Sequence, residues 1–253
     1  NNAANDFTGT SLVMAGGLKP GVVDALAPLS RHTISGDAVS GTLNLAGLNQ
    51  TIGSLSSTGS VEGNAVVAFA ATETLTVGAD RSQDAVYAGA ITGAGVFRVN
   101  GNGAIQTLAV ADNSAQTWNT QIANGVLNLA SGAKLAAGSA AVQIGVAGVT
   151  GADDFTGLHL QNTAVMANNL VVNNVNSVGS AVISASGSNA ALTGTVTLDR
   201  NVYVGAATGS QLSLENTVSG NGTITVVDGG TVRLTSANTF GAGVSGTSGT
   251  PMA

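Results

Sequence analysis

Histidines and carboxylates are the residues of this sequence that could do chemistry, and there are few of them. The chain of 253 residues contains two histidines, 13 aspartates and glutamates, and no cysteine. His32 and His159 are far apart in the sequence and lack the close spacing of paired zinc ligands. We therefore expect both histidines to be structural residues that face solvent. The sequence predicts no metal site and no cofactor site.

Acidic residues offer one candidate for catalysis. Asp153 and Asp154 are adjacent, whereas Asp80 and Asp84 flank Arg81. Enzymes that cleave polysaccharides commonly use a pair of carboxylates. Asp153 and Asp154 are therefore the candidate catalytic pair if the chain is such an enzyme. Acidic residues close to glycine are more typical of turns, and Gly151 precedes this pair by two residues. We expect no catalytic residues and no enzyme, and keep a polysaccharide-active enzyme as a third alternative.

Positive charge is too sparse for a nucleic-acid partner. Lys and Arg together number seven, and the formal net charge is -6. A protein that binds nucleic acid needs clustered Lys and Arg to neutralise phosphates. The composition therefore excludes nucleic acid as the expected partner.

Short alternating segments are the elements that would position these side chains. Aliphatic and polar residues alternate in segments of four or five residues, such as 74–77, 194–198 and 222–226. Pairs such as Asn102-Gly103 lie between them and are typical of turns. Strong helix formers are scarce, so we expect an all-β protein with almost no helix. Residues 19–32 interrupt the pattern and are interpreted as a loop or a short helical excursion.

An internal repeat decides between two all-β architectures, an antiparallel sandwich or barrel and a parallel β-solenoid. Residues 55–61, 91–97 and 218–224 share the order aliphatic, Ser or Thr, small, any, Gly, any, aliphatic. Two long blocks about 125 residues apart then pass through the same series of elements. Such repetition favours a solenoid, in which each coil covers the next. At roughly 20 to 25 residues per coil we expect about 10–12 coils in one domain, residues 1–253, and a rod of about 50 to 60 Å.

These segments resemble the passenger-associated repeats of bacterial autotransporters. The resemblance is carried by residues 5–10, 41–45, 51–61, 218–222 and 238–241, in that order. It implies a right-handed parallel β-helix that is exported through an outer-membrane barrel. It also implies an extracellular location on the bacterial surface. The sequence itself carries no barrel pattern, so we expect contact with a membrane only through a translocator barrel that is absent here.

The two ends of the sequence match each other. Asn5 and Phe7 occupy the same places in their segment as Asn238 and Phe240. We name these four residues as candidates for end-to-end stacking, and we expect asparagines at this phase, Asn113 included, to form ladders from coil to coil. Phe7, Trp118 and Phe240 are predicted to fill the core below a corner. A carbohydrate-stacking surface is the alternative for these aromatic residues.

The sequence therefore leaves three hypotheses for function. The first is a structural rod on the bacterial surface, a passenger segment that serves as a stalk or adhesion scaffold. The second is a self-assembling filament or surface-layer subunit, because an uncapped solenoid tends to associate through its ends. The third is the polysaccharide-active enzyme. The expected partners are copies of the chain or adjoining coils of the same passenger, and a host-cell or glycan receptor is not identified by the sequence.

Overall fold

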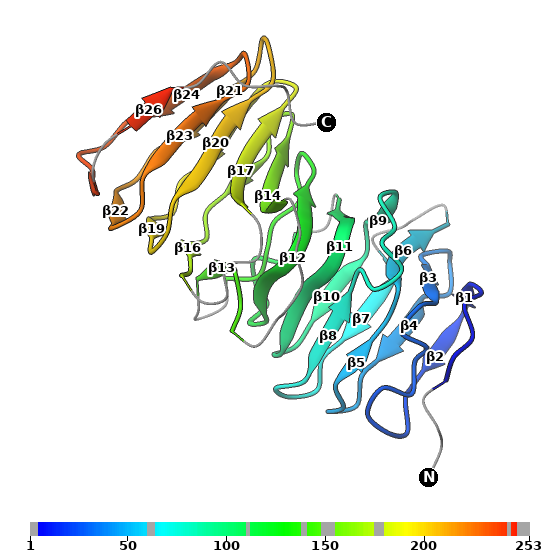
Figure 1. Cartoon of the computed structure of the whole chain (residues 1–253). Coiled ribbons are helices and arrows are strands. Elements are labelled where there is room, and N and C mark those ends of the chain that lie inside the picture. The colour runs from blue at the N-terminus through cyan, green and yellow to red at the C-terminus, as the bar shows by residue number, and fades with distance from the viewer. Residues whose placement is uncertain are drawn as a thin grey trace.

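Twenty-six short strands, and no α-helix, make up the described part of the chain. The computed structural model describes residues 5–59, 64–109, 112–137, 141–147, 155–174, 180–241 and 244–246. All strand pairings in these ranges are parallel. The strands stack turn upon turn from β1 and β2 at one end to β24 and β26 at the other (Figure 1). The predicted parallel β-solenoid is thus confirmed.

Four sheets form the walls of the solenoid. A three-stranded sheet contains β1 (Ser11–Val13), β3 (Arg31–Ser35) and β6 (Ser54–Thr58). A four-stranded sheet contains β2 (Gly16–Leu18), β4 (Gly41–Asn44), β7 (Val66–Ala68) and β10 (Ala90–Thr92). A second four-stranded sheet contains β15 (Val165–Met166), β18 (Asn189–Leu192), β21 (Gln211–Leu214) and β24 (Thr231–Leu234).

The largest sheet has 15 strands and covers two walls. One wall is formed by β5 (Gln50–Thr51), β8 (Thr74–Val77), β11 (Val96–Leu108), β12 (Asn119–Leu129), β13 (Val142–Ile144), β16 (Leu170–Val172), β19 (Val196–Leu198), β22 (Val218–Gly220) and β25 (Thr239–Phe240). The other is formed by β9 (Ala85–Tyr87), the later parts of β11 and β12, β14 (Phe155–Gln161), β17 (Ser180–Ser186), β20 (Val202–Ala206), β23 (Ile224–Val227) and β26 (Val244–Gly246). The long strands β11 and β12 join the walls because each pairs along its length with strands of both.

The solenoid has about nine turns, fewer than the 10–12 expected. The turns are longer than the repeat pattern predicted in the middle of the chain. Val142 pairs with Leu170, and Leu170 pairs with Val196, so these two turns use 28 and 26 residues. At about 4.8 Å per turn the stack is about 43 Å long rather than 50 to 60 Å. In the interrupted region, residues 19–30 form turns and bends without a helix.

Identical or similar aliphatic side chains stack in register through the interior. Such a row runs along one wall and consists of Val77, Val99, Ile122, Ile144, Val172 and Leu198. All six are fully buried. Burying a side chain of this size stabilises the fold by about 1.5 to 3 kcal/mol, so each turn is held mainly by the apolar row above and below it.

Trp118 fills the core as predicted. Its side chain is 1% exposed, its indole N–H donates to the Ile91 carbonyl at 2.9 Å, and its ring meets the edge of Phe97 at 6.1 Å between centroids. The carbohydrate-stacking alternative is therefore wrong for this residue. Phe240 packs against the core and is partly buried, whereas Phe7 is 45% exposed, so the prediction of a core position is wrong for Phe7.

Four asparagine side chains among the described residues bridge successive turns, and each does so through a backbone N–H and not through another asparagine. The amide oxygen of Asn113 accepts the N–H of Ile91 at 2.9 Å, and that of Asn238 accepts the N–H of Val218 at 2.7 Å. Asn49 binds Thr74, and Asn169 binds Thr195, in the same way. In each case the side-chain amide oxygen accepts a backbone N–H at or next to the start of a short strand. Without the asparagine this N–H would have no hydrogen-bond partner in the sheet.

Candidate functional sites

His32 is buried in the first turns, contrary to the expectation that it faces solvent. It lies on β3 between Ser11 and Leu55, and its side chain is 1% exposed. Neither ring nitrogen has a hydrogen-bond partner. Burial lowers the pKa of His32 from 6.5 to about 4, because the charged imidazolium would lose its hydration. His32 is therefore a neutral core residue at pH 7, with no geometry for metal binding or proton transfer to a substrate.

His159 lies on the outward face of β14 and is half-buried, so it is only partly open to solvent. Its Nδ1 lies 2.8 Å from the hydroxyl oxygen of Ser184, and its Nε2 lies 2.8 Å from that of Ser186. Burial lowers the pKa of His159, and the negative charge of Asp228 opposes this shift without cancelling it. Because both nitrogens are engaged by serines, the imidazole is a bridge between two strands.

The acidic candidates serve the contacts between turns. Asp84 forms an ion pair with Arg31, and Asp80 accepts a hydrogen bond from Ser54 at 2.7 Å. Hydrogen bonds from Ser82 and then Arg31 hold the pKa of Asp84 below its usual range. Asp153 and Asp154 lie outside the described residues. No group of three or more His, Cys, Asp or Glu side chains converges as a metal site within the part of the chain that the structure describes.

The four candidate stacking residues lie near opposite ends of the solenoid. Asn5 donates from its amide nitrogen to the Ala25 carbonyl of the following turn, and Phe7 meets His32 edge to face at 6.5 Å between ring centroids. Asn238 also donates to the Ser236 carbonyl at 2.7 Å, and Phe240 lies on the last strand of its wall, paired only with Gly220 of the preceding turn. The structure thus places two residues near each end; whether they mediate stacking stays a prediction.

The first turns expose an unusual amount of apolar surface. Most of the exposed large hydrophobic side chains among the described residues lie before residue 40, namely Phe7, Leu12, Met14, Val22, Val23, Leu29 and Val39. The strands β1 and β2 are also the outer strands of their sheets, so each has a backbone edge without a strand partner. Apolar surface next to an open sheet edge is typical of an interaction surface.

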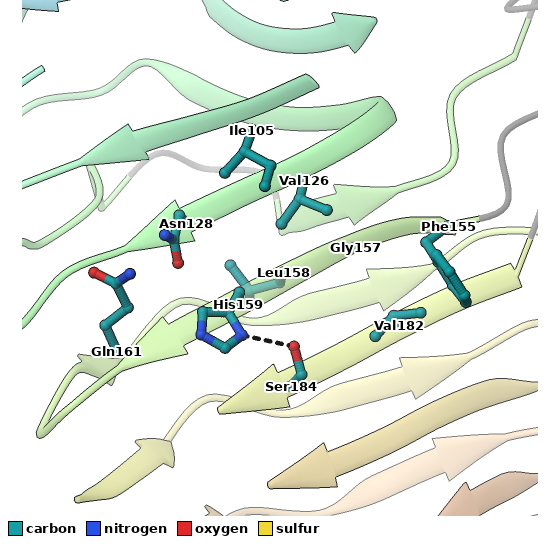
Figure 2. A pocket seen from close by; sticks show the side chains of 10 residues that line it. All are labelled: Ile105, Val126, Asn128, Phe155, Gly157, Leu158, His159, Gln161, Val182 and Ser184. Atoms are coloured by element: carbon teal, nitrogen blue, oxygen red, sulfur yellow. Dashed lines mark hydrogen bonds between the residues drawn. The ribbon is translucent and has the colours of Figure 1, made fainter. Parts of the chain in front are cut away.

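A groove on the outward face of one wall is a site that the sequence analysis missed. It has a volume of about 240 Å³ and crosses β11, β12, β14 and β17. Along β14 the outward residues are Phe155, Gly157, His159 and Gln161 (Figure 2). Phe155 lies at one end of the groove and Gln161 at the other. The alternation of outward residues in 155–161 was visible in the sequence, but the neighbouring strands that complete the groove were not.

Gly157 creates the hollow. In the strand register it stands between Val126 of β12 and Val182 of β17, so the outward row has a side chain on both sides and none in the middle. A Cβ atom at this position would lie 2.4 Å from the Val182 carbonyl oxygen, which is too close for any side chain. The apolar floor therefore requires glycine, and Asn128, His159 and Ser184 provide polar atoms along its side.

Comparison with known proteins relates the chain to a bacterial adhesin. The chain is 30% identical over 236 residues to the adhesin BmaC autotransporter of Brucella suis biovar 1 (strain 1330), which is 93% of this chain and 6% of that protein. The chain thus spans about 6% of the length of this relative. No protein-family model matches the chain, and no solved structure gives a significant match. The described residues form no helix that is long and apolar enough to cross a bilayer.

Proposed function

We propose, from its similarity to an autotransporter adhesin and from its β-solenoid fold, that this chain forms a stalk segment on the bacterial surface. The relative is an adhesin autotransporter. In this proposal the chain is extracellular and serves as an adhesion scaffold, and its neighbours are further coils of the same passenger. The two described hollows give the polysaccharide-active enzyme no support, because neither is lined by a pair of carboxylates.

The observation that carries this proposal is the continuous stack of turns. Among the described residues every wall repeats the same parallel pairing, and rows of buried aliphatic side chains continue from turn to turn. Such a stack is stiff because each turn is hydrogen-bonded and packed on both sides. Its function would then lie in spacing and presentation more than in chemistry.

Surface labelling tests this function directly. Antibodies against the solenoid should label intact cells of the source bacterium, and protease added outside should remove the label. A periplasmic protein that is labelled only after permeabilisation is the control. Labelling of the solenoid only after permeabilisation would contradict a surface stalk.

A self-assembling filament is the second candidate, and the apolar surface of the first turns favours it. Leu12 on the outer strand β1 is 51% exposed. If copies stack through their ends, the sedimentation coefficient of the purified chain should rise with concentration, and Leu12→Glu should abolish this rise. Val86→Glu is a matched control, because Val86 is 42% exposed but lies on β9, away from the ends. A concentration-independent monomer would exclude the filament and leave the stalk proposal intact.

A further inference from the structure

The groove on the outward wall has the properties of a ligand site. It is a concave surface with an apolar floor and a few polar side chains along one side, which is the usual composition of a binding site for a small molecule. A scaffold requires none of this, because the outward residues of a stalk need only be soluble. The following argument concerns the groove alone and does not depend on the stalk proposal.

One hydroxyl hydrogen beside the groove is available for a ligand. A neutral imidazole has one N–H donor and one acceptor nitrogen. His159 is bonded through both nitrogens, so one of Ser184 and Ser186 donates to the ring and the other accepts from it. The accepting serine keeps its own O–H. The amide of Gln161 supplies further donors and an acceptor at the end of the groove, and no hydrogen bond joins it to the other residues drawn there (Figure 2).

The charge around the groove favours an uncharged ligand. None of the described residues that line the groove is Asp, Glu, Lys or Arg. The carboxylate of Asp228 acts on His159 electrostatically, and its negative charge would repel an anion. No cation lines the groove to compensate for this repulsion. An acidic glycan or a phosphorylated ligand is therefore disfavoured.

A half-exposed aromatic ring extends the apolar floor. Phe155 at the end of the groove is 43% exposed. A flat apolar ring of this kind can stack on the C–H face of a sugar ring, while amide and hydroxyl groups bind the sugar hydroxyls. Tyr203 stands one turn beyond the groove, in a separate hollow that Asp199 and Arg200 also line.

The strand pairing disfavours an extended peptide as the occupant. β14 is hydrogen-bonded to β12 on one side and to β17 on the other, so its backbone groups are already paired. A peptide that adds to a sheet needs a free strand edge, and this wall has none at the groove.

We propose that the groove formed by Phe155, Gly157, His159 and Gln161 binds a neutral oligosaccharide. The chain of sugars runs along the groove from Phe155 towards Gln161. Phe155 stacks on a sugar ring, and Gln161 and the free serine hydroxyl bind sugar hydroxyls. The site would allow the stalk itself, and not only a domain that it presents, to contact a glycan.

Methyl NMR of the whole chain tests this proposal. The probes are chitotetraose, cellotetraose and maltotetraose, which are uncharged, and a heparin tetrasaccharide, which is anionic. We expect at least one neutral probe to shift the methyl signals of Val126 and Val182, which flank Gly157. Phe155→Ala and Gln161→Ala should each raise the Kd for that probe about fivefold. Phe7→Ala should leave the Kd unchanged, because Phe7 is equally exposed but lies in the first turns.

Each other outcome overturns the proposal. If no neutral probe shifts these methyl signals at about 10 mM, the groove does not bind such sugars with measurable affinity. A shift caused by the heparin probe alone would show that the ligand is anionic. An unchanged Kd in Phe155→Ala would place the binding elsewhere. Methyl signals outside the groove report whether a variant is folded, and surface labelling of cells tests the stalk proposal separately.

Discussion

Replacing His32 by leucine is expected to stabilise the first turns of the solenoid, and to do so more strongly in acid. The imidazole is 1% exposed and both nitrogens lack partners. A buried polar group without a partner costs about 1 to 3 kcal/mol. Leucine has a similar size and no polar atom, so we expect a gain of about 1 kcal/mol at pH 7 after imperfect packing is allowed for.

The acid dependence follows from the pKa of His32. Its pKa is about 4 in the folded protein and 6.5 in the unfolded chain, so protonation favours unfolding. Above pH 6.5 the imidazole is neutral in both states and has no effect on the pH dependence. Between pH 6.5 and pH 4 the folded state loses about 3 kcal/mol relative to the unfolded state, at about 1.4 kcal/mol per pH unit. Below pH 4 the loss is complete. The leucine variant should lack this loss.

Hydrogen exchange measured by mass spectrometry is the suitable assay, because turns of a solenoid contact only their neighbours and can open locally. Peptides that cover β1, β3 and β6 should be more protected in His32→Leu than in the parent chain. After correction for intrinsic exchange rates, the difference should grow by about 2 kcal/mol between pH 7 and pH 5. His159→Leu is the control: it removes hydrogen bonds to Ser184 and Ser186, so it should destabilise β14 and leave β1 unchanged. A His32→Leu gain that is equal at both pH values would refute the argument.

Three further substitutions test the contacts that hold the turns together. Glu73→Gln should weaken the turn that precedes β8. Burial raises the pKa of Glu73, but hydrogen bonds from the backbone N–H groups of Ala70, Ala71 and Gly47 lower it more. The parent chain should therefore lose stability as the pH falls below about 4.5, whereas the variant should not, and urea unfolding at pH 7 and pH 3 measures the difference. Ile122→Ala should lower the free energy of unfolding by about 2 to 5 kcal/mol, because it leaves a gap in a fully buried row. Fluorescence of Trp118 reports the unfolding. A loss below about 1 kcal/mol would contradict the stacked core. Asn113→Ala should cost about 1 to 2 kcal/mol by leaving the N–H of Ile91 unpaired, with a matching loss of protection at that amide.

The fold was accessible from the sequence because its signals are local and repeated. Alternation within segments such as 74–77 predicted strands, and the recurrence of Gly-centred segments predicted stacked turns. The number of turns was overestimated because the pattern carries no information on the length of the connections, and those around residues 142–196 are long. Phase within the repeat indicated that Asn113 and Asn238 connect successive turns, but it could not show that each amide binds backbone and not another asparagine.

The groove and the buried histidine could not be predicted for a different reason. The outward row that contains Gly157 combines residues from separate turns, and it becomes visible only when the register of β12, β14 and β17 is known. His32 was assigned to the surface because its type is polar. Its position on β3 between Ser11 and Leu55 instead directs the ring inward, where Phe7 contacts it.

The direction of the hydrogen bonds has a mechanical consequence. Bonds between parallel neighbours run along the axis of the stack, so a pull on the two ends loads only the outermost turn at a given moment. The molecule should therefore unfold one turn at a time, starting from its ends. Thr74 and Val96 are partners in adjacent turns, 22 residues apart, whereas Val142 and Leu170 are 28 residues apart, so each step should release about 75 to 95 Å of extended chain. Single-molecule stretching should record a series of such steps at low force, and their lengths should follow the lengths of the turns.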